Sequence, residues 1–385
     1  MNILIISRGI PTKQNPLWGN FEYDHAKALT KLGHQVVMAS VDMRFSLKRG
    51  KWGLTISKDD EDGIHKYNLC ACPEAIIKFF LGEKIKEKIK QTLWRKVENL
   101  ILQNEESFDI IYPHYLKNTY KAVTYLQNSE DTPIVAIEHW SEINKSTLAP
   151  YVQKMGEEVY PKVNKLLTVS KAAQKAIKEH FHMDSLVVYN MVGEKFRFTP
   201  RKYNNETVHF IATGSLIYRK GFDLLIEALA KLQLPKDKWE LNIIGSGKEH
   251  DNLQKQIAKH DLNRYIHFVG QQTAEQIMIW MNNSDAFVLP SRMETFGVVY
   301  IEAMACGLPV IATPCGGPEE YVNAKNGLLV PIDDVDALAA AIQHMYEHHQ
   351  DYDRIAIADD CKARFSSEVI AKKLTTIFEE VIAKQ

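Results

Sequence analysis

The sequence predicts an α/β fold of two doubly wound, Rossmann-like domains. Short apolar runs alternate with amphipathic helical patterns along most of the chain, and this alternation restarts at Val208. A length of 385 residues also suits two separate hydrophobic cores. The polar stretch 193–206, which carries Pro200, predicts the linker between them. We therefore expect domains at 1–195 and 196–366, followed by a C-terminal helix at 367–385.

The apolar runs predict the strands in order, because strands buried on both faces form nearly continuous apolar segments. In the first half these predicted strands are 3–6, 36–40, 109–113, 133–139 and 166–170, with helices near 21–32 and 84–102. In the second half they are 208–213, 241–245, 266–270, 286–290, 309–313 and 327–331.

Composition excludes several classes of protein. The formal net charge is −1 and 25% of the residues are charged, so no basic excess points to nucleic acid. The segment 1–10 predicts a first strand and not a secretory signal, and no run approaches the ~18 apolar residues of a membrane-spanning helix. The five cysteines are an odd number, and Cys70 and Cys72 are too close for a metal-binding pair. These features indicate reduced thiols in a cytoplasmic protein.

The most informative motif is the segment 291–317, SRMETFGVVYIEAMACGLPVIATPCGG. Glu294 lies in a strand-to-helix loop, at the sheet edge where parallel sheets bind ligands. The backbone N–H groups of Phe296, Gly297 and Val298 begin the helix and suit a phosphate. Glu302 lies more than a turn inside the helix, and its side chain can lean back toward the same ligand. An isolated pair of this kind would more often be two solvated glutamates, so the surrounding sequence decides.

The run ETFGVVYIE at 294–302, followed by AMACGLPVIAT and a Gly-Gly pair, resembles the donor-binding segment of a large group of retaining glycosyltransferases. That group includes bacterial lipopolysaccharide and phosphatidylinositol sugar transferases and relatives of glycogen synthase. The resemblance implies the GT-B fold, in which two Rossmann-like domains face each other across a cleft and a last helix returns to the first domain. It also implies that Glu294 binds sugar hydroxyls near the reacting face and Glu302 the ribose hydroxyls of a nucleotide-sugar.

A second loop places two cations at the start of a helix. Arg219 and Lys220 precede Gly221 and an amphipathic pattern, and they suit a diphosphate leaving group because negative charge accumulates there as the glycosidic bond breaks. Many relatives carry an Arg directly after the first Gly, where this chain has Ser215, so Arg219 is expected to replace it from the far end of the loop. Gly19 alone is a weak signal, but the resemblance implies that it approaches the donor phosphates.

Two histidines follow predicted strands in the first half. His139 ends the run PIVAIEH, and the resemblance implies that it contacts the donor sugar or the reaction centre. His114 follows DIIYP and is a candidate for the acceptor pocket, outside the catalytic set.

Two apparent metal motifs have simpler explanations. Asp334 and Asp336 have the spacing of a metal-binding pair, yet they directly precede a helical pattern and suit helix initiation. His344 and His348 lie four residues apart on that same helix, but no third ligand accompanies them. We expect no metal and no cofactor.

The stretch 82–102 predicts an amphipathic helix with six basic residues, next to Phe79 and Phe80. Two interpretations remain open. The helix can lie on an anionic membrane, which fits a lipid-linked acceptor. It can equally pack its apolar face on the sheet and leave its lysines solvated.

Together these features predict a retaining, metal-independent hexosyltransferase. The donor is expected to be a UDP-sugar rather than a GDP-sugar, and the acceptor a glycan or glycolipid in polysaccharide or cell-envelope biosynthesis. Without an evident second carboxylate, retention favours front-face attack over a covalent route through Glu294. Two alternatives are a sugar-nucleotide epimerase on the same scaffold and a non-catalytic sugar-nucleotide-binding protein.

Overall fold

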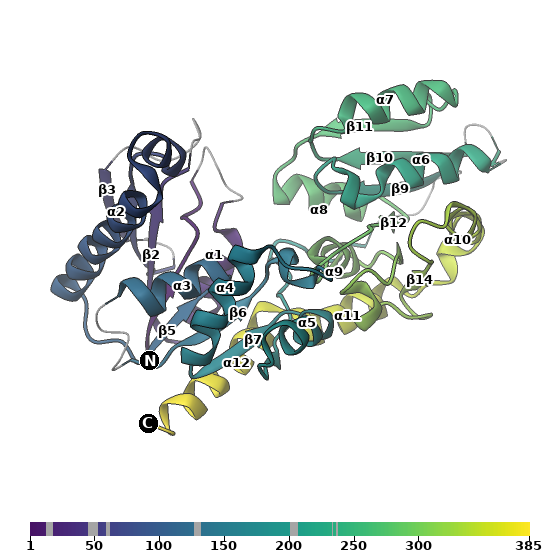
Figure 1. The fold of residues 1–385 in the computed structure, drawn as a ribbon. Coiled ribbons are helices and arrows are strands. Elements are labelled where there is room, and N and C mark those ends of the chain that lie inside the picture. The colour runs from purple at the N-terminus through teal and green to yellow at the C-terminus, as the bar shows by residue number, and fades with distance from the viewer. Residues whose placement is uncertain are drawn as a thin grey trace. The chain divides into compact units, whose positions relative to one another are not determined.

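A computed structural model describes the chain from residue 1 to 385 except 13–17, 45–52, 59–61, 127–131, 201–206, 233 and 236–237. The second half of the predicted linker, 201–206, therefore lies outside the described residues. The chain divides into two compact units (Figure 1). Unit 1 comprises 1–169, 173–188 and 367–385, and unit 2 comprises 170–172 and 189–366.

Unit 1 is built on a largely parallel sheet. Five strands lie in the order β3-β4-β2-β1-β5, and three more in the order β6-β7-β8. Bridges from Ile111 to Ile134 and from His114 to Ile137 join the two sets through β5 and β6. Only the β3–β4 pair is antiparallel among the described strand pairs of this unit. The strands are β1 (Asn2–Ile6), β2 (Gln35–Asp42), β3 (Gly53–Lys58), β4 (His65–Cys70), β5 (Ile110–Pro113), β6 (Val135–Glu138), β7 (Lys165–Thr168) and β8 (Leu186–Val187).

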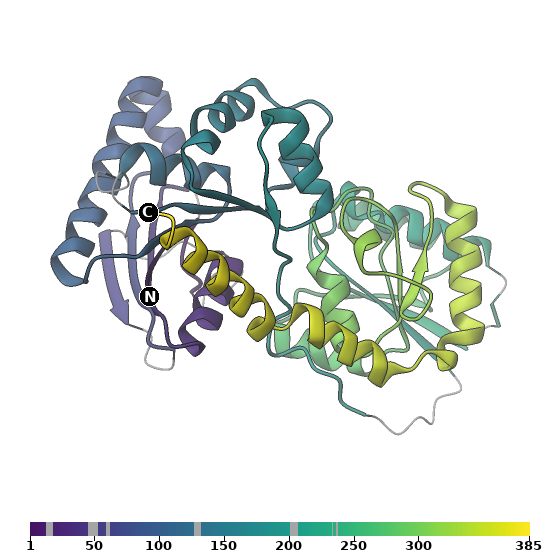
Figure 2. The ribbon, with the colours of Figure 1, turned by 90° about the horizontal axis from the view of Figure 1, so that it is seen from below.

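Helices cover the sheet of unit 1 and bury its apolar side chains. They are α1 (Asn20–Lys31), α2 (Glu74–Asn104), α3 (Leu116–Tyr125), α4 (Pro150–Val159), α5 (Lys171–Phe181) and α12 (Ser367–Ile382). The last helix, α12, packs against α1, as Figure 2 shows. Phe378 of α12 meets the ring of Tyr112 on β5 at 5.1 Å between centroids, and the Thr375 hydroxyl lies 2.8 Å from Nε2 of His34.

Unit 2 contains one six-stranded parallel sheet in the order β11-β10-β9-β12-β13-β14. Its strands are β9 (Val208–Thr213), β10 (Trp239–Ile244), β11 (Ile266–Gly270), β12 (Ala286–Val288), β13 (Val310–Ala312) and β14 (Gly327–Leu329). Its helices are α6 (Phe222–Lys231), α7 (His250–Lys259), α8 (Ala274–Asn282), α9 (Val298–Ala305), α10 (Val335–His348) and α11 (Arg354–Phe365).

The predicted α/β class is confirmed, since every apolar run named from the sequence contains a strand. The antiparallel strand β3 and its partner β4 escaped prediction because neither is a continuous buried run: the described side chains of β3 are exposed, and β4 mixes buried with half-buried positions. The basic helix also differs from the expected 82–102, since α2 begins at Glu74 and continues through a break at Gly82, where φ is 78°. Phe79 and Phe80 therefore lie on the same element as the lysines.

Candidate functional site

The loop between β12 and α9 buries Glu294 at the carboxyl edge of the unit 2 sheet. Its backbone N–H donates to the carbonyl of Cys315, 3.0 Å away, just beyond the neighbouring strand β13. The side chain is 7% exposed, and its Oε1 accepts from the Ser291 hydroxyl at 2.8 Å. A buried carboxylate needs such donors, because an unpaired charge away from water is costly.

The predicted cation and the predicted carboxylate meet directly. Nζ of Lys220 donates to Oε1 of Glu294 at 2.6 Å, and the lysine side chain is only 12% exposed. Lys220 ends a short 3-10 turn, Tyr218–Lys220, and Gly221 after it has φ 70°. A β-carbon at Gly221 would lie 2.0 Å from the carbonyl oxygen of Pro290, so the two loops approach each other as only glycine allows. Two segments 74 residues apart thus form one site.

The start of α9 offers a row of backbone donors. Gly297 is the N-cap with φ 86°, and α9 begins at Val298. Within the described part of the chain, the N–H groups of Phe296, Gly297 and Val298 have no hydrogen-bond partner. The Tyr321 hydroxyl lies 2.7 Å from the carbonyl of Phe296 and 3.0 Å from that of Gly297. The Tyr321 hydroxyl thus fixes the loop through its carbonyl groups, while the N–H groups of the loop suit an anion.

Arg292 ties the two loops together on their outer side. Its backbone N–H donates to the carbonyl of Arg219 at 2.8 Å, and its guanidinium binds both carboxylate oxygens of Asp223 at 2.7 and 2.8 Å. The guanidinium also donates to Asp333 at 2.6 Å and stacks over the ring of Tyr218. The Asp223 carboxylate raises the pKa of Arg292, which therefore remains a fixed cation. Arg219 has no side-chain partner among the described residues, and its part in the site stays a prediction.

Glu302 lies half-buried in the second turn of α9. Its assignment to the ribose also stays a prediction.

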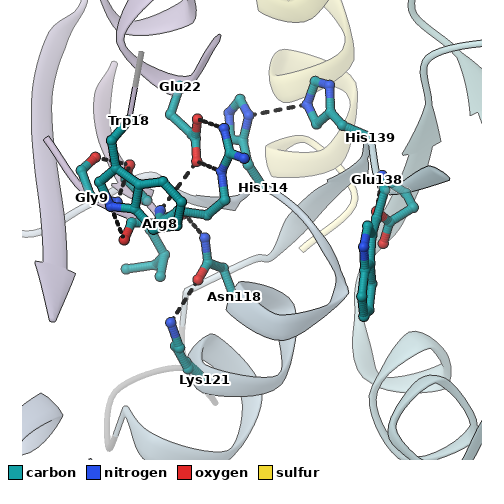
Figure 3. Close-up of polar contacts among 12 residues, drawn as sticks. Arg8, Gly9, Trp18, Glu22, His114, Asn118, Lys121, Glu138 and His139 are labelled. Atoms are coloured by element: carbon teal, nitrogen blue, oxygen red, sulfur yellow. Dashed lines mark hydrogen bonds and ion pairs between the residues drawn. The ribbon is translucent and has the colours of Figure 1, made fainter. Parts of the chain in front are cut away.

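In unit 1, Arg8 and Gly19 lie where β1 ends and α1 begins. Arg8 pairs with the fully buried Glu22 through two contacts of 2.9 and 3.1 Å and lies over the ring of Tyr115 (Figure 3). Gly19 has φ 80°, and a β-carbon there would lie 2.0 Å from the carbonyl oxygen of Gly9. Position 19 thus requires glycine for the packing of its own loop, whether or not a phosphate comes near.

His139 belongs to a buried group of histidines. It follows β6 directly and is 8% exposed, and its Nε2 lies 3.2 Å from Nδ1 of His114, which follows β5 and is fully buried (Figure 3). His25 of α1 packs edge-on against both rings, and its Nδ1 lies 3.0 Å from the Tyr112 hydroxyl. The prediction that His114 lines an acceptor pocket does not fit a side chain with 0% exposure.

Glu138 anchors the strand end that carries His139. Its carboxylate accepts from the backbone N–H groups of Leu116 and Trp140, each at 2.7 Å, and from the Tyr160 hydroxyl at 2.8 Å. Burial raises its pKa to about 7, against the effect of these three donors. Glu138 thereby joins β6, the start of α3 and the turn after α4.

The apparent metal motifs have structural roles. The Asp334 carboxylate accepts from the N–H of Ala337 at 2.9 Å, which confirms it as the N-cap of α10. His348 pairs with Asp351 at the end of the same helix. In the described ranges, no group of three or more His, Cys, Asp or Glu side chains is arranged to hold a metal ion.

Known families match both halves of the chain. Glycosyl transferases group 1 matches residues 193–358, and glycosyltransferase family 4 matches residues 19–194. The phosphatidyl-myo-inositol mannosyltransferase of Mycolicibacterium smegmatis is 30% identical over 295 residues, which cover 74% of this chain and 74% of that protein. The chain belongs to the family 4 glycosyltransferases.

Solved structures share the GT-B fold of this glycosyltransferase. Sucrose-phosphate synthase from Thermosynechococcus elongatus has a TM-score of 0.79 at 17% identity, with 100% of both chains covered. Anabaena HepE, solved in complex with UDP-glucose, has a TM-score of 0.72 at 20% identity and covers 99% of this chain and 100% of that one. At sequence identities this low, the similarity to these two structures shows a shared fold only.

Sequence reasoning missed the residues that support the glycosyltransferase site. Ser291 and Arg292 lie inside the quoted motif, but nothing in one sequence pairs Arg292 with Asp223. Tyr321 lies beyond the motif, and no local pattern shows that its hydroxyl returns to Phe296. The available signal was the position of Ser291 and Arg292 directly after the predicted strand 286–290, at the carboxyl end where parallel sheets bind ligands.

Proposed function

We propose that this glycosyltransferase moves a hexosyl group from a UDP-sugar to a hydroxyl of a glycan or glycolipid, with retention of the anomeric configuration. The observation that carries the proposal is the buried contact between Lys220 and Glu294 beside the start of α9, whose first N–H groups have no hydrogen-bond partner among the described residues. One cation, one carboxylate and three backbone donors lie within two adjoining loops. This combination suits a sugar joined to a diphosphate.

The roles follow from charge and position. Lys220 and the N–H groups of Phe296, Gly297 and Val298 stabilise the negative charge that develops on the departing diphosphate. Glu294, held by Lys220 and Ser291, accepts hydrogen bonds from sugar hydroxyls. Glu302 binds the ribose, and His139 in unit 1 steadies the sugar.

In the proposed reaction the acceptor oxygen attacks the anomeric carbon on the face that the leaving group departs from. The bond from that carbon to the diphosphate oxygen breaks, and the acceptor proton passes to a phosphate oxygen. Neither step needs a second enzyme carboxylate. We favour this route over a covalent sugar ester on Glu294, because the proposed role of that carboxylate is to hold sugar hydroxyls.

We propose UDP as the donor nucleotide because Anabaena HepE is a fold relative solved with UDP-glucose. A relative from Corynebacterium glutamicum is named as a GDP-mannose-dependent mannosyltransferase, so GDP-sugars belong in the test. No observation favours the epimerase alternative.

A thermal-shift screen of UDP-, GDP-, ADP- and dTDP-sugars tests the donor. A ligand that binds only the folded protein stabilises it by about 2.7 kcal/mol at 100 times its Kd. We expect the largest shift with a UDP-sugar, and transfer products from that donor with the donor's anomeric configuration by NMR. A larger shift with GDP-sugars would overturn the choice of base, and an inverted product would overturn retention.

Metal independence is a separate prediction. Because Lys220 and the start of α9 supply the positive potential, we expect transfer to proceed equally in excess EDTA and in magnesium. The measurement is the initial rate in both buffers after exhaustive dialysis against chelator. A rate that chelator abolishes and magnesium or manganese restores would show that a metal takes part.

We further propose that the start of α2 contacts an anionic membrane, which fits a lipid-linked acceptor. Phe79, Phe80 and Leu81 are 83%, 74% and 51% exposed. In the described part of the chain, the exposed Lys84 and Lys88 nearby have no carboxylate partner. Apolar side chains beside unpaired lysines suit the interface of an anionic bilayer. No described helix is long and apolar enough to cross a membrane.

The structure narrows which lysines can serve this contact. Lys86 is 8% exposed and forms ion pairs with Glu83 and Glu87, while Lys90 pairs with Glu74 at 3.5 Å. These two of the six basic residues predicted on the helix form ion pairs within α2 and are poor candidates for lipid contact.

We expect the wild-type protein to sediment with anionic liposomes at low salt and to be released at high salt. Changing Phe79 and Phe80 to Ser, or Lys84 and Lys88 to Ser, should weaken this binding, with each lysine worth ~1 kcal/mol at the surface. Lys175→Ser on α5 is the control, because that lysine is also exposed, pairs with Glu179 at 3.7 Å and lies far from Phe79 and Phe80 in the sequence. If the wild-type protein does not bind anionic liposomes, the membrane role fails and α2 only covers the sheet of unit 1.

A further inference from the structure

His114 and His139 meet as a stacked, hydrogen-bonded pair of rings. Their planes lie 6° apart with centroids at 5.1 Å, and Nδ1 of His114 lies 3.2 Å from Nε2 of His139. The two residues directly follow β5 and β6, and a bridge from His114 to Ile137 fixes the register of these strand ends. The backbone thus places the pair on rigid elements, as precise positioning of a ring requires.

The surroundings keep His114 uncharged. Burial and the neighbouring His25, His139 and Arg8 hold the pKa of His114 well below its usual range. Burial and His139 lower the pKa of His25 in the same way. Glu22 faces Arg8, which lies over Tyr115, and Glu138 binds backbone donors and Tyr160. Among the described groups, none of these carboxylates is a hydrogen-bond partner of His114.

The contact to His139 is the single hydrogen bond of the His114 ring in the described structure. The Nε2 atom of His114 is buried and has no partner among the residues that the structure describes. A buried polar atom left unpaired costs about 1–3 kcal/mol, so an apolar ring would be the cheaper choice if position 114 served packing alone.

The backbone beside His114 is also strained. Tyr115 has φ 70° and ψ 146°, which a non-glycine residue rarely adopts. Such a conformation costs on the order of 1–3 kcal/mol and persists where the surrounding structure enforces it, often at functional sites. The Tyr115 N–H donates to the carbonyl of Ile137 at 2.8 Å, and its ring lies 5.0 Å from that of His139. The ring of the strained residue Tyr115 therefore packs beside the ring of His139.

We propose that His114 is a positioning residue, whose Nδ1 holds the His139 imidazole at one orientation for contact with the donor sugar. The inference rests on the proposed role of His139. The hydrogen bond and the stacking together restrict rotation of the His139 ring. His114 itself stays buried and touches neither substrate.

The test uses two substitutions that separate the ring nitrogens of His114. In His114→Asn the oxygen and nitrogen of the amide are bonded to Cγ, as Nδ1 is in histidine. A hydrogen bond from this position to His139 can therefore persist. In His114→Gln the oxygen and nitrogen of the amide are bonded to Cδ, so they lie near the position of Nε2 in histidine. The hydrogen bond from the Nδ1 position to His139 is therefore lost. We expect Asn to retain most of the turnover, and Gln to lower kcat on the order of 100-fold, as a misplaced reacting group does, with the donor KM little changed.

His25→Gln is the matched control, because it removes the bond of a buried histidine in the same cluster to Tyr112 and not to His139. We expect it to lower the melting temperature as His114→Gln does, with a smaller loss of kcat. If His114→Asn and His114→Gln have equal kcat, or if His25→Gln loses as much kcat as His114→Gln, then His114 serves packing alone.

Long-range proton–nitrogen NMR of the imidazoles provides a readout that does not depend on turnover. We expect the Nε2 signal of His139 to keep its hydrogen-bonded shift in His114→Asn and to lose it in His114→Gln. If the wild-type protein transfers sugar from no nucleotide-sugar, the proposed function fails, while these spectra still test the bond between the rings. An unchanged His139 signal in the Gln variant would overturn the positioning role.

Discussion

Lys220→Ala is expected to reduce turnover about 100-fold or more, in the range seen when one preorganised electrostatic donor is removed from an enzyme. The lysine lies at the end of a turn that Gly221 and Arg292 hold against the Glu294 loop. Its charge is therefore in place before the diphosphate departs, and no reorganisation is needed as the bond breaks. The measurement is kcat with the donor that the thermal-shift screen selects.

The substitution also leaves Glu294 without its cation. Removing one partner of a buried ion pair typically costs about 3–5 kcal/mol, and here Ser291 still donates to the carboxylate. We therefore expect a lower melting temperature as well as lower turnover, and kcat is compared at a temperature where both proteins are folded.

Lys231→Ala is the matched control for Lys220→Ala. Lys231 ends α6, the helix that begins after Lys220, and it pairs with Asp336 at the surface with 50% of its side chain exposed. A surface pair of this kind contributes ~0–1 kcal/mol, so turnover and stability should hardly change. Wild-type turnover in Lys220→Ala would remove the lysine from the site.

The strands that carry the site could be predicted because each is a continuous apolar run. Strand β12, residues 286–288, and strand β13, residues 310–312, are buried on both faces, so their sequences show no competing pattern. The start of α9 at Val298 could also be predicted, because Gly297 directly precedes it. In these places local composition and tertiary environment require the same residues.

The contacts within the site could not be predicted in this way. Lys220 and Glu294 are 74 residues apart, and a single sequence does not report which loops of a parallel sheet meet. The bidentate contact of Arg292 with Asp223 and the stacking of His114 on His139 likewise depend on strand order. Buried lysines such as Lys86 also escaped prediction, because their exposure depends on which carboxylates of the helix turn toward them.

Glu294→Gln and Glu302→Gln are expected to affect different steps. Losing a hydrogen bond to a charged group costs about 1.5–3 kcal/mol, which is roughly 10- to 150-fold in a rate or an equilibrium constant. For Glu294 we expect this loss mainly in kcat, because the carboxylate holds sugar hydroxyls beside the reacting carbon. For Glu302, half-buried on α9, we expect it mainly in the donor Kd, because the ribose is bound equally before and during the reaction.

A double-mutant comparison shows whether Glu294 and Lys220 act as one unit. Their atoms are in contact at 2.6 Å, and neighbours in one hydrogen-bonded network show non-additive effects. Once Lys220 is absent, Glu294 loses the cation that orients it. We therefore expect the double variant Lys220→Ala, Glu294→Gln to turn over little more slowly than the worse single variant. Independent, multiplying losses would mean that the two side chains contact the donor separately, and that the donor breaks their contact when it binds.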